Sequence, residues 1–296
     1  MSDRMDGVLA VGFVAAWSSG FIGAELGTRA APATALLAWR FIIAFALLGG
    51  WMLYRRNRVP PRELGLHLII GGLGQAGYLY GVFAAVEHGV ASGTTALICA
   101  LQPIVAVALA VPLLGESVSA RQIVGFLIGL GGVALVVSGD LSASSAPLLA
   151  YLLPVAAMLS LVAATLLERR TRPRATLVDA LTIQAGISAL LFGGLATATG
   201  TLAPPADPTF WIAIAVLVVA AMFGGYGLYW INLARTGVAR VSALLYLTPP
   251  ATMAWSWLMF GTTMTPVSLG GVGVCALAVL LIRTKTPAEP LEPTHA

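Results

Sequence analysis

The chain has 296 residues, of which 58% are hydrophobic and only 9% are charged, and its mean hydropathy is +0.92. A water-soluble domain of this length carries far more charge, so the composition argues against a soluble protein and indicates a chain embedded in lipid. The isoelectric point near 9.4 does not indicate nucleic-acid binding, because the positive charge is sorted along the chain by membrane side.

Ten apolar stretches can be read between charged or proline-rich breaks, each long enough for the roughly 20 residues that cross a bilayer. They run over about 7–26, 32–54, 66–87, 90–114, 120–138, 147–167, 175–198, 209–234, 239–261 and 266–282. The first starts with a short charged segment, as a signal peptide does, but nine spans follow it and we interpret it as a retained helix. No glycine-rich phosphate motif is present, so nothing indicates ATP coupling or a cofactor.

Basic residues gather in two loops, after the second and the sixth stretch. These loops contain Arg55, Arg56, Arg58 and Arg62, and Arg169, Arg170, Arg172 and Arg174. With a cytoplasmic N-terminus, 14 of the 16 Lys and Arg residues fall on the cytoplasmic side, Arg29 falls outside and Arg40 lies within a span. The positive-inside rule therefore predicts two cytoplasmic termini in a bacterial-type inner membrane, with residues 284–296 forming a disordered cytoplasmic tail.

The chain divides into two similar halves, residues 1–140 and 146–283. A shift of 141 residues places Ser19, Arg29 and Pro32 on Ser160, Arg170 and Pro173. Because each half has an odd number of spans, the second half enters the membrane from the opposite side. Two inverted repeats are the common plan of secondary transporters, and the alternative is a duplicated scaffold with no transport role.

Arg40 is the one strongly charged residue inside a predicted span, because every Asp and Glu falls near a span end or in a loop. One interpretation is a bidentate clamp for a carboxylate, on the substrate or on Glu25. The other is an arginine that extends to the outer headgroups beside Trp39. The lack of a central carboxylate weakens a simple proton antiport, but not coupling by an interfacial acid.

Prolines occur at mirrored places near the centres of the fourth and ninth spans, at Pro103 and at Pro249 and Pro250. A proline removes a helix hydrogen bond, and the freed carbonyl must lie beside protein or a water-lined cavity. We expect a hinge at these prolines; a tolerated kink is the alternative. By contrast, the glycine-rich fifth and tenth spans have almost no polar side chains, so we interpret them as a packing seam.

Neutral polar and aromatic side chains gather at matching depths in the spans, as expected around a cavity for a small polar or amphipathic solute. The candidate cavity residues, with Arg40, are Trp17, Ser19, Gln75, Tyr78, Gln102, Tyr226, Tyr229, Trp230 and Tyr246. Taken singly, a residue of this kind more often makes helix–helix contacts or, near a span end, belongs to an interfacial aromatic belt. Cys99 and Cys275 lie inside spans and are interpreted as packing residues, with no metal site.

The chain resembles the EamA repeat of the drug/metabolite transporter superfamily, once in each half. The matching segments are Trp17-Ser18-Ser19-Gly20-Phe21, Arg40-Phe41, Leu101-Gln102-Pro103, Leu114-Gly115-Glu116, Gly132-Val133, Leu247-Thr248-Pro249-Pro250 and Gly273-Val274. The halves are not equivalent, because Thr262 stands where the family often has Glu and Leu181 aligns with Arg40. The resemblance implies ten helices around a central cavity, alternating access and a small solute, often an amino acid or related metabolite that is exported.

We therefore predict an all-α polytopic membrane protein that acts as a secondary transporter, exporting amino acids or related metabolites. The cavity is expected between spans one, three, four, six, eight and nine, in a chain that functions as a monomer with a small-molecule substrate and lipid as its partners, without nucleic acid. The alternatives are a lipid or lipid-sugar flippase or a drug exporter. A membrane-embedded enzyme would need acids and histidines clustered at depth, whereas His67 and His88 sit at span ends.

Overall fold

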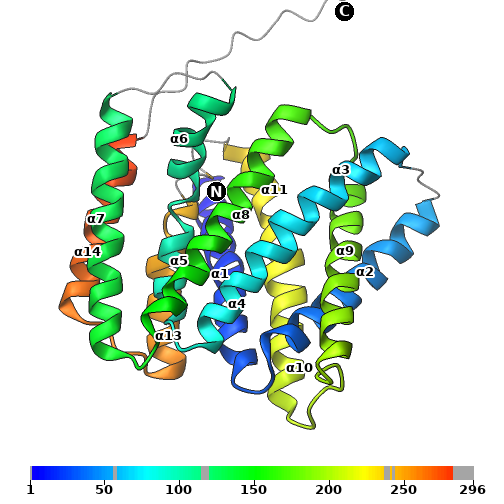
Figure 1. The fold of residues 1–296 in the computed structure, drawn as a ribbon. Coiled ribbons are helices and arrows are strands. Elements are labelled where there is room, and N and C mark those ends of the chain that lie inside the picture. Colours follow the sequence, from blue (N-terminus) through cyan, green and yellow to red (C-terminus); the bar gives the residue numbers. More distant parts are fainter. Residues whose placement is uncertain (1, 56–58, 115–119, 237–240, 242–243, 283–296) are drawn as a thin grey trace, which may run out of the picture.

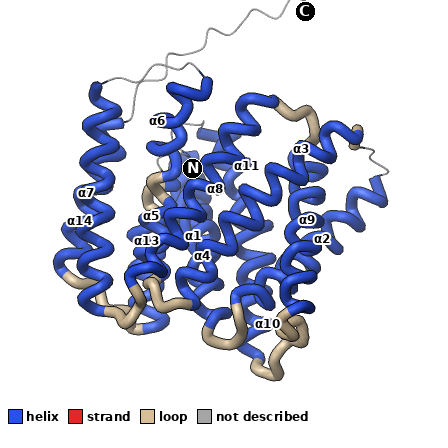
Figure 2. The backbone as a smooth tube through the Cα atoms, viewed as in Figure 1, coloured by secondary structure: helices blue, strands red, loops and turns tan. Residues whose placement is uncertain are grey.

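The computed structural model describes residues 2–55, 59–114, 120–236, 241 and 244–282. Within this part of the chain every regular element is a helix and no strand occurs (Figure 2). The predictions for Arg56, Arg58, Gly115-Glu116 and Arg240, and for the tail at 284–296, lie outside the described residues.

The first half begins with two long helices and continues with shorter ones. Its elements are α1 (Ser2–Thr28), α2 (Ala33–Arg55), α3 (Pro61–Gly71), η1 (Gly72–Gly77), α4 (Tyr78–Glu87), α5 (Ser92–Cys99), α6 (Gln102–Leu114) and α7 (Ala120–Ala143). The second half comprises η2 (Leu148–Tyr151), α8 (Leu152–Thr171), α9 (Leu177–Ala198), α10 (Pro208–Ala215), η3 (Val216–Gly224), α11 (Gly225–Thr236), α13 (Thr248–Phe260) and α14 (Pro266–Ile282).

Seven continuous helical segments in the described ranges are long and apolar enough to cross a bilayer, and two shorter apolar ones cover Ser92–Ala106 and Pro266–Ala278. Large apolar side chains face outward along these helices; Leu190 is 74% exposed and Leu258 is 72% exposed. A water-soluble protein rarely exposes so much apolar surface, whereas lipid favours it. The prediction of an all-helical polytopic membrane protein is confirmed.

The helices are interrupted where the prolines lie. The expected fourth span is not one helix: α5 ends at Cys99 and α6 begins at Gln102, with Pro103 in its first turn. In the ninth span, Pro249 and Pro250 occupy the first turn of α13 rather than its middle. The prolines therefore mark helix breaks rather than kinks within a continuous helix, because a proline is tolerated in a helix's first turn, where its missing N–H is not needed.

Two wide turns precede the tyrosines of the third and eighth spans. The π-helical segment η1 joins α3 to α4 just before Tyr78, and η3 joins α10 to α11 just before Tyr226. Such turns occur mostly as short insertions in α-helices, frequently at functional sites. They lie at corresponding places in the two halves, and nothing in the sequence reading predicted them.

Helices α7 and α14 pack along each other at one edge of the molecule (Figure 1). Their backbones approach closely at Gly132 and Gly271, where a Cβ on Gly271 would lie 2.7 Å from the carbonyl oxygen of Gly132. Only glycine allows this approach, which is why the seam is rich in small residues. Elsewhere α2 packs on α9 and α4 packs on α8.

The first turn of α3 lies beside the arginine-rich loop between α8 and α9, at one end of the helices. The Glu63 carboxylate, in the first turn of α3, accepts hydrogen bonds from the backbone N–H groups of Arg174 at 3.0 Å and Ala175 at 3.3 Å, in the loop between α8 and α9. The start of α1 and the end of α11 are joined by an ion pair between Asp6 and Arg235 at 2.7 Å. The loop that follows α1 lies at the opposite end (Figure 1).

Candidate functional site

A cavity of about 340 Å³ lies in the middle of the molecule, between residues of both halves. Several of the predicted cavity residues line it: Trp17, Arg40, Gln75, Tyr78, Gln102, Pro103, Tyr226 and Tyr246. Helices α1, α2, α4, α5, α6, α8, α11 and α13 contribute to its wall, together with η1 and η3, whereas α7 and α14 contribute none of the described lining residues. Its volume falls at the lower end of the range for small-molecule sites, about 300–1,000 Å³.

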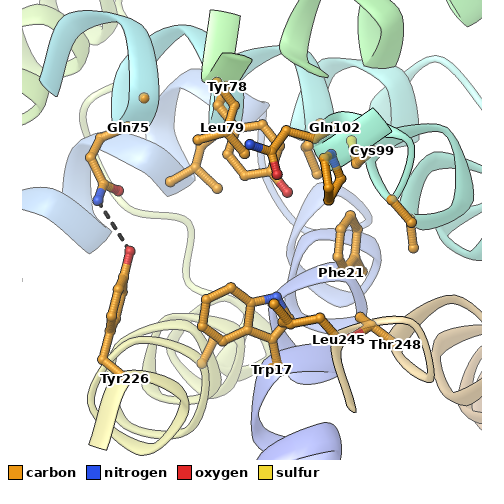
Figure 3. A pocket seen from close by; sticks show the side chains of 18 of the residues that line it. Trp17, Phe21, Gln75, Tyr78, Leu79, Cys99, Gln102, Tyr226, Leu245 and Thr248 are labelled. Carbon is orange, nitrogen blue, oxygen red and sulfur yellow. Dashed lines mark hydrogen bonds between the residues drawn. The ribbon is translucent and has the colours of Figure 1, made fainter. Parts of the chain in front are cut away.

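The cavity has two facing walls (Figure 3). Gln75, Leu79 and Gln102 form one, and Tyr226 and Trp17 face them across the open space. The Gln75 amide reaches across and donates a long hydrogen bond of 3.5 Å to the Tyr226 hydroxyl. Trp17 and Tyr226 meet edge to face, with ring centroids 5.7 Å apart, so both rings are fixed.

Arg40 lines this cavity and is only 7% exposed, so it does not extend to the headgroups. The neighbouring Trp39 instead faces α10, where its ring packs on Trp211 at 5.3 Å and its indole N–H donates to the carbonyl of Leu202 at 2.9 Å. The Nε and Nη1 atoms of Arg40 have no hydrogen-bond partner among the described residues. A buried guanidinium with unused donors is an unusual feature, because burial of an unpaired charge is costly.

Ser19, Tyr229 and Trp230 are not in the cavity wall. The Ser19 hydroxyl donates to the Ala16 carbonyl of its own helix at 2.6 Å. The Tyr229 ring packs on Trp17, with ring centroids 6.2 Å apart, and Trp230 is 46% exposed. Of the three prolines, Pro103 lines the cavity. Pro249, which follows the lining residue Thr248 in the sequence, is buried, and Pro250 is exposed.

Cys99 and Thr248 also line the cavity. The sequence places Thr248 among the polar residues of the ninth span and predicts Cys99 as a packing residue, but neither is among the candidate cavity residues. A lone cysteine in an apolar span is most simply interpreted as packing, and both cysteines are indeed free and buried. Thr248 borders the helix break, and its backbone carbonyl accepts a long hydrogen bond of 3.4 Å from Ser18 on α1.

A line of hydroxyl groups leads from the cavity toward the end of the molecule that contains Arg29. Thr248, Thr252 and Ser256 recur every four residues, so they share one face of α13, and this helix packs on α5. The side-chain oxygens of Thr248, Thr252 and Thr95 are buried without a hydrogen-bond partner in the described part of the chain. Unsatisfied buried hydroxyls are uncommon in folded proteins.

Glu25 lies at the end of this row of hydroxyl groups, next to Ser256. Its Oε2 atom accepts hydrogen bonds from Ser92 of α5 at 2.6 Å and Ser256 of α13 at 2.8 Å, while Oε1 pairs with Arg29 at 3.0 Å. One carboxylate thus ties three helices from both halves together. Beyond it lies a second, polar pocket of about 310 Å³ with Asp140, whose carboxylate accepts a bond from the Tyr151 hydroxyl at 2.8 Å. No group of three or more potential metal ligands occurs among the residues described.

An all-helical membrane protein with a cavity lined by aromatic, amide and apolar side chains of both halves has the architecture expected of a protein that handles small solutes within the bilayer. The EamA-like transporter family model matches the chain twice, at residues 7–138 and 147–284. The chain therefore belongs to the EamA-like transporter family, which confirms the resemblance seen in the sequence.

Relatives of similar length fit this membership. A "Probable amino-acid metabolite efflux pump" of Salmonella typhimurium is 26% identical over 90% of this chain and 91% of its own. A "Probable terminal-alkyne amino-acid exporter" of Streptantibioticus cattleyicolor is 27% identical over 92% and 91%. The "Uncharacterized inner membrane transporter YedA" of Escherichia coli K12 is 23% identical over 95% and 91%.

One solved crystal structure shares the fold with a TM-score of 0.63, covering 95% of this chain and 99% of the other chain. The two sequences are 19% identical, so this likeness concerns the fold alone.

Proposed function

We propose that this chain is a secondary exporter of amino acids or closely related small metabolites, and that it works by alternating access. The observation that carries the proposal is the central cavity, because polar and aromatic side chains of both halves converge on a space suited to one small solute. Two relatives, named as a probable amino-acid metabolite efflux pump and a probable terminal-alkyne amino-acid exporter, support the substrate class.

The architecture we propose is ten spans arranged as inverted repeats, residues 1–140 and 146–283, in a bacterial inner membrane with both termini cytoplasmic. The family model matches once in each half. The first turn of α3, which contains Arg62, and the arginine-rich loop between α8 and α9 lie at one end of the helices, as the positive-inside rule requires of a cytoplasmic face. The wide turns η1 and η3 at corresponding places also favour a repeat. The relative YedA is named as an inner membrane transporter.

In this proposal the structure represents a state closed toward the outside. Glu25 holds α1, α5 and α13 together between the cavity and the Arg29 loop, so release of its hydrogen bonds to Ser92 and Ser256 would open that route. The unpartnered hydroxyls of Thr95 and Thr252 would then gain water as a partner. Pro103 and the Pro249-Pro250 pair adjoin the helix breaks, where the half-helices α6 and α13 can tilt.

The test of transport is exchange in proteoliposomes that contain the purified chain, with a panel of amino acids, nucleosides and cationic drugs. We expect exchange of at least one amino-acid-like solute. Trp17→Ala, in the cavity, should lower exchange at least tenfold (an order-of-magnitude expectation), whereas Trp257→Ala, 53% exposed on the surface, should leave it unchanged. No exchange of any solute by correctly folded protein would refute the transporter.

The inverted plan has a separate test. Ser144→Cys, in a background with Cys99 and Cys275 replaced by alanine, should react with a membrane-impermeant thiol reagent from outside the cell. Reaction only from the cytoplasmic side would overturn the proposed orientation of the two halves.

A further inference from the structure

Arg40 presents a cation to the cavity without a compensating anion. Only 7% of the surface of this residue is exposed. Its Nε and Nη1 atoms lack hydrogen-bond partners among the described residues. Arginine stays protonated even when buried, so it cannot escape the cost of burial by losing its charge. A charge in such a place is explained best when a ligand supplies the missing partner.

The carboxylates that could pair with Arg40 are committed elsewhere. Glu25, the partner that the sequence left open, is held by Arg29, Ser92 and Ser256. Asp140 accepts from Tyr151 at the outer end. The described lining of the cavity contains no Asp or Glu at all. The cavity therefore carries a net positive charge when empty.

The rest of the lining is neutral and suits the remainder of an amino-acid-like molecule. Trp17, Tyr78 and Tyr226 provide aromatic surface, and Gln75 and Gln102 provide amide oxygens that can accept hydrogen bonds. An ammonium group next to the carboxylate would find these π-faces and oxygens, although no acidic side chain would pair with it. A cation without a carboxylate would be repelled by the positive charge of Arg40, and no acidic side chain in the described lining would offset this repulsion.

We infer that the cavity selects solutes by a free carboxylate, which Arg40 binds through its unused N–H groups, and that it discriminates against cations and against amides of the same solutes. This inference rests on the proposed transport function and names its substrate class: zwitterionic and anionic carboxylates of about amino-acid size, with an apolar or aromatic body. Export of cationic drugs is disfavoured for the same reason, because Arg40 would repel a cation in the cavity.

The test measures binding and exchange together for matched compounds. The full-length purified chain is titrated with phenylalanine, 3-phenylpropionate, phenylalaninamide and phenethylamine, with thermal stabilisation and competition for exchange as readouts. We expect the two carboxylates to bind about ten- to a hundredfold more tightly than the two compounds without one, the range for a hydrogen bond to a charged group.

Arg40→Gln should abolish this acid-over-amide preference while the protein remains folded, and Arg40→Lys should keep part of it, because lysine retains the charge but not the planar donor pair. Arg55→Gln, at the exposed end of the same helix, is the matched control and should keep the full preference. If Arg40→Gln does not fold, the ratio of acid affinity to amide affinity is compared between the wild type and Arg40→Lys instead. A smaller ratio in Arg40→Lys supports the inference, and an unchanged ratio contradicts it.

Equal binding of acids and amides by the wild type would overturn the inference, as would an unchanged preference in Arg40→Gln. In either case exchange of some other solute would leave the proposed transport function standing. If no compound exchanges at all, the transport proposal itself fails, and that outcome is distinct because it appears before any selectivity is measured.

Discussion

The Glu25 closure gives the sharpest prediction. Glu25→Gln keeps the size of the side chain but turns the hydrogen bonds from Ser92 and Ser256 from charge-assisted into neutral ones. Bonds to a charged group contribute about 1.5–3 kcal/mol each and neutral ones about 0.5–1.5 kcal/mol. The two bonds together should therefore lose about 2 kcal/mol. We add nothing for Arg29, because its side chain is 54% exposed and the pair is screened by water.

A loss of about 2 kcal/mol from the closed state corresponds to about a thirtyfold shift toward the state open to the outside. The shift can be read from Thr252→Cys, in a background without the native cysteines, because Thr252 is fully buried between the cavity and Glu25. Its reaction with an impermeant thiol reagent added outside should be about thirty times faster when Glu25→Gln is present.

Glu87→Gln is the matched control, because Glu87 lines the outer pocket but is exposed and has no hydrogen bond to α5 or α13 among those described. It should leave the labelling rate unchanged. An unchanged or slower rate in Glu25→Gln, with the protein folded, would refute the idea that this carboxylate holds the outer side closed.

Two further predictions concern the packing seam and the cavity. Gly271→Ala should destabilise the protein by about 1–3 kcal/mol, because its Cβ would lie 2.8 Å from the backbone nitrogen of Val136. The control Gly270→Ala should be neutral, because a Cβ there meets nothing within 4 Å. Equal thermal stability of the two variants would contradict the close approach of α7 and α14. In Cys275→Ala, a transported solute should slow the alkylation of Cys99 by a small thiol reagent, since Cys99 lines the cavity; alkylation at the same rate with saturating solute would argue against binding there.

The sequence allowed the class of protein and much of the cavity to be predicted, for physical reasons. Long apolar stretches require helices in lipid, so the helical class followed from composition alone. Arg40, Gln75 and Tyr226 could be chosen because polar groups at membrane depth need partners or a cavity, and all three line the cavity of the structure.

Other features could not be predicted from a single sequence. A proline near the middle of an apolar stretch is compatible with a kink or a break, and only the backbone bonds on either side, such as the one from Leu101 N–H to the Ile98 carbonyl, distinguish them. Likewise Tyr226, Tyr229 and Trp230 lie within little more than one turn of α11 and point in different directions. Contacts with α1 determine that Tyr226 faces the cavity while Trp230 faces outward.

The central claim is that one cavity serves both sides of the membrane in turn, and counterflow tests it most directly. Proteoliposomes loaded with an excess of an unlabelled solute that the chain exchanges are placed in a trace of the same labelled solute. A carrier with alternating access should accumulate label transiently above its equilibrium level, because the excess unlabelled solute inside competes with the label for the site and slows its exit. A steady rise to equilibrium without an overshoot would indicate a pore and contradict the account.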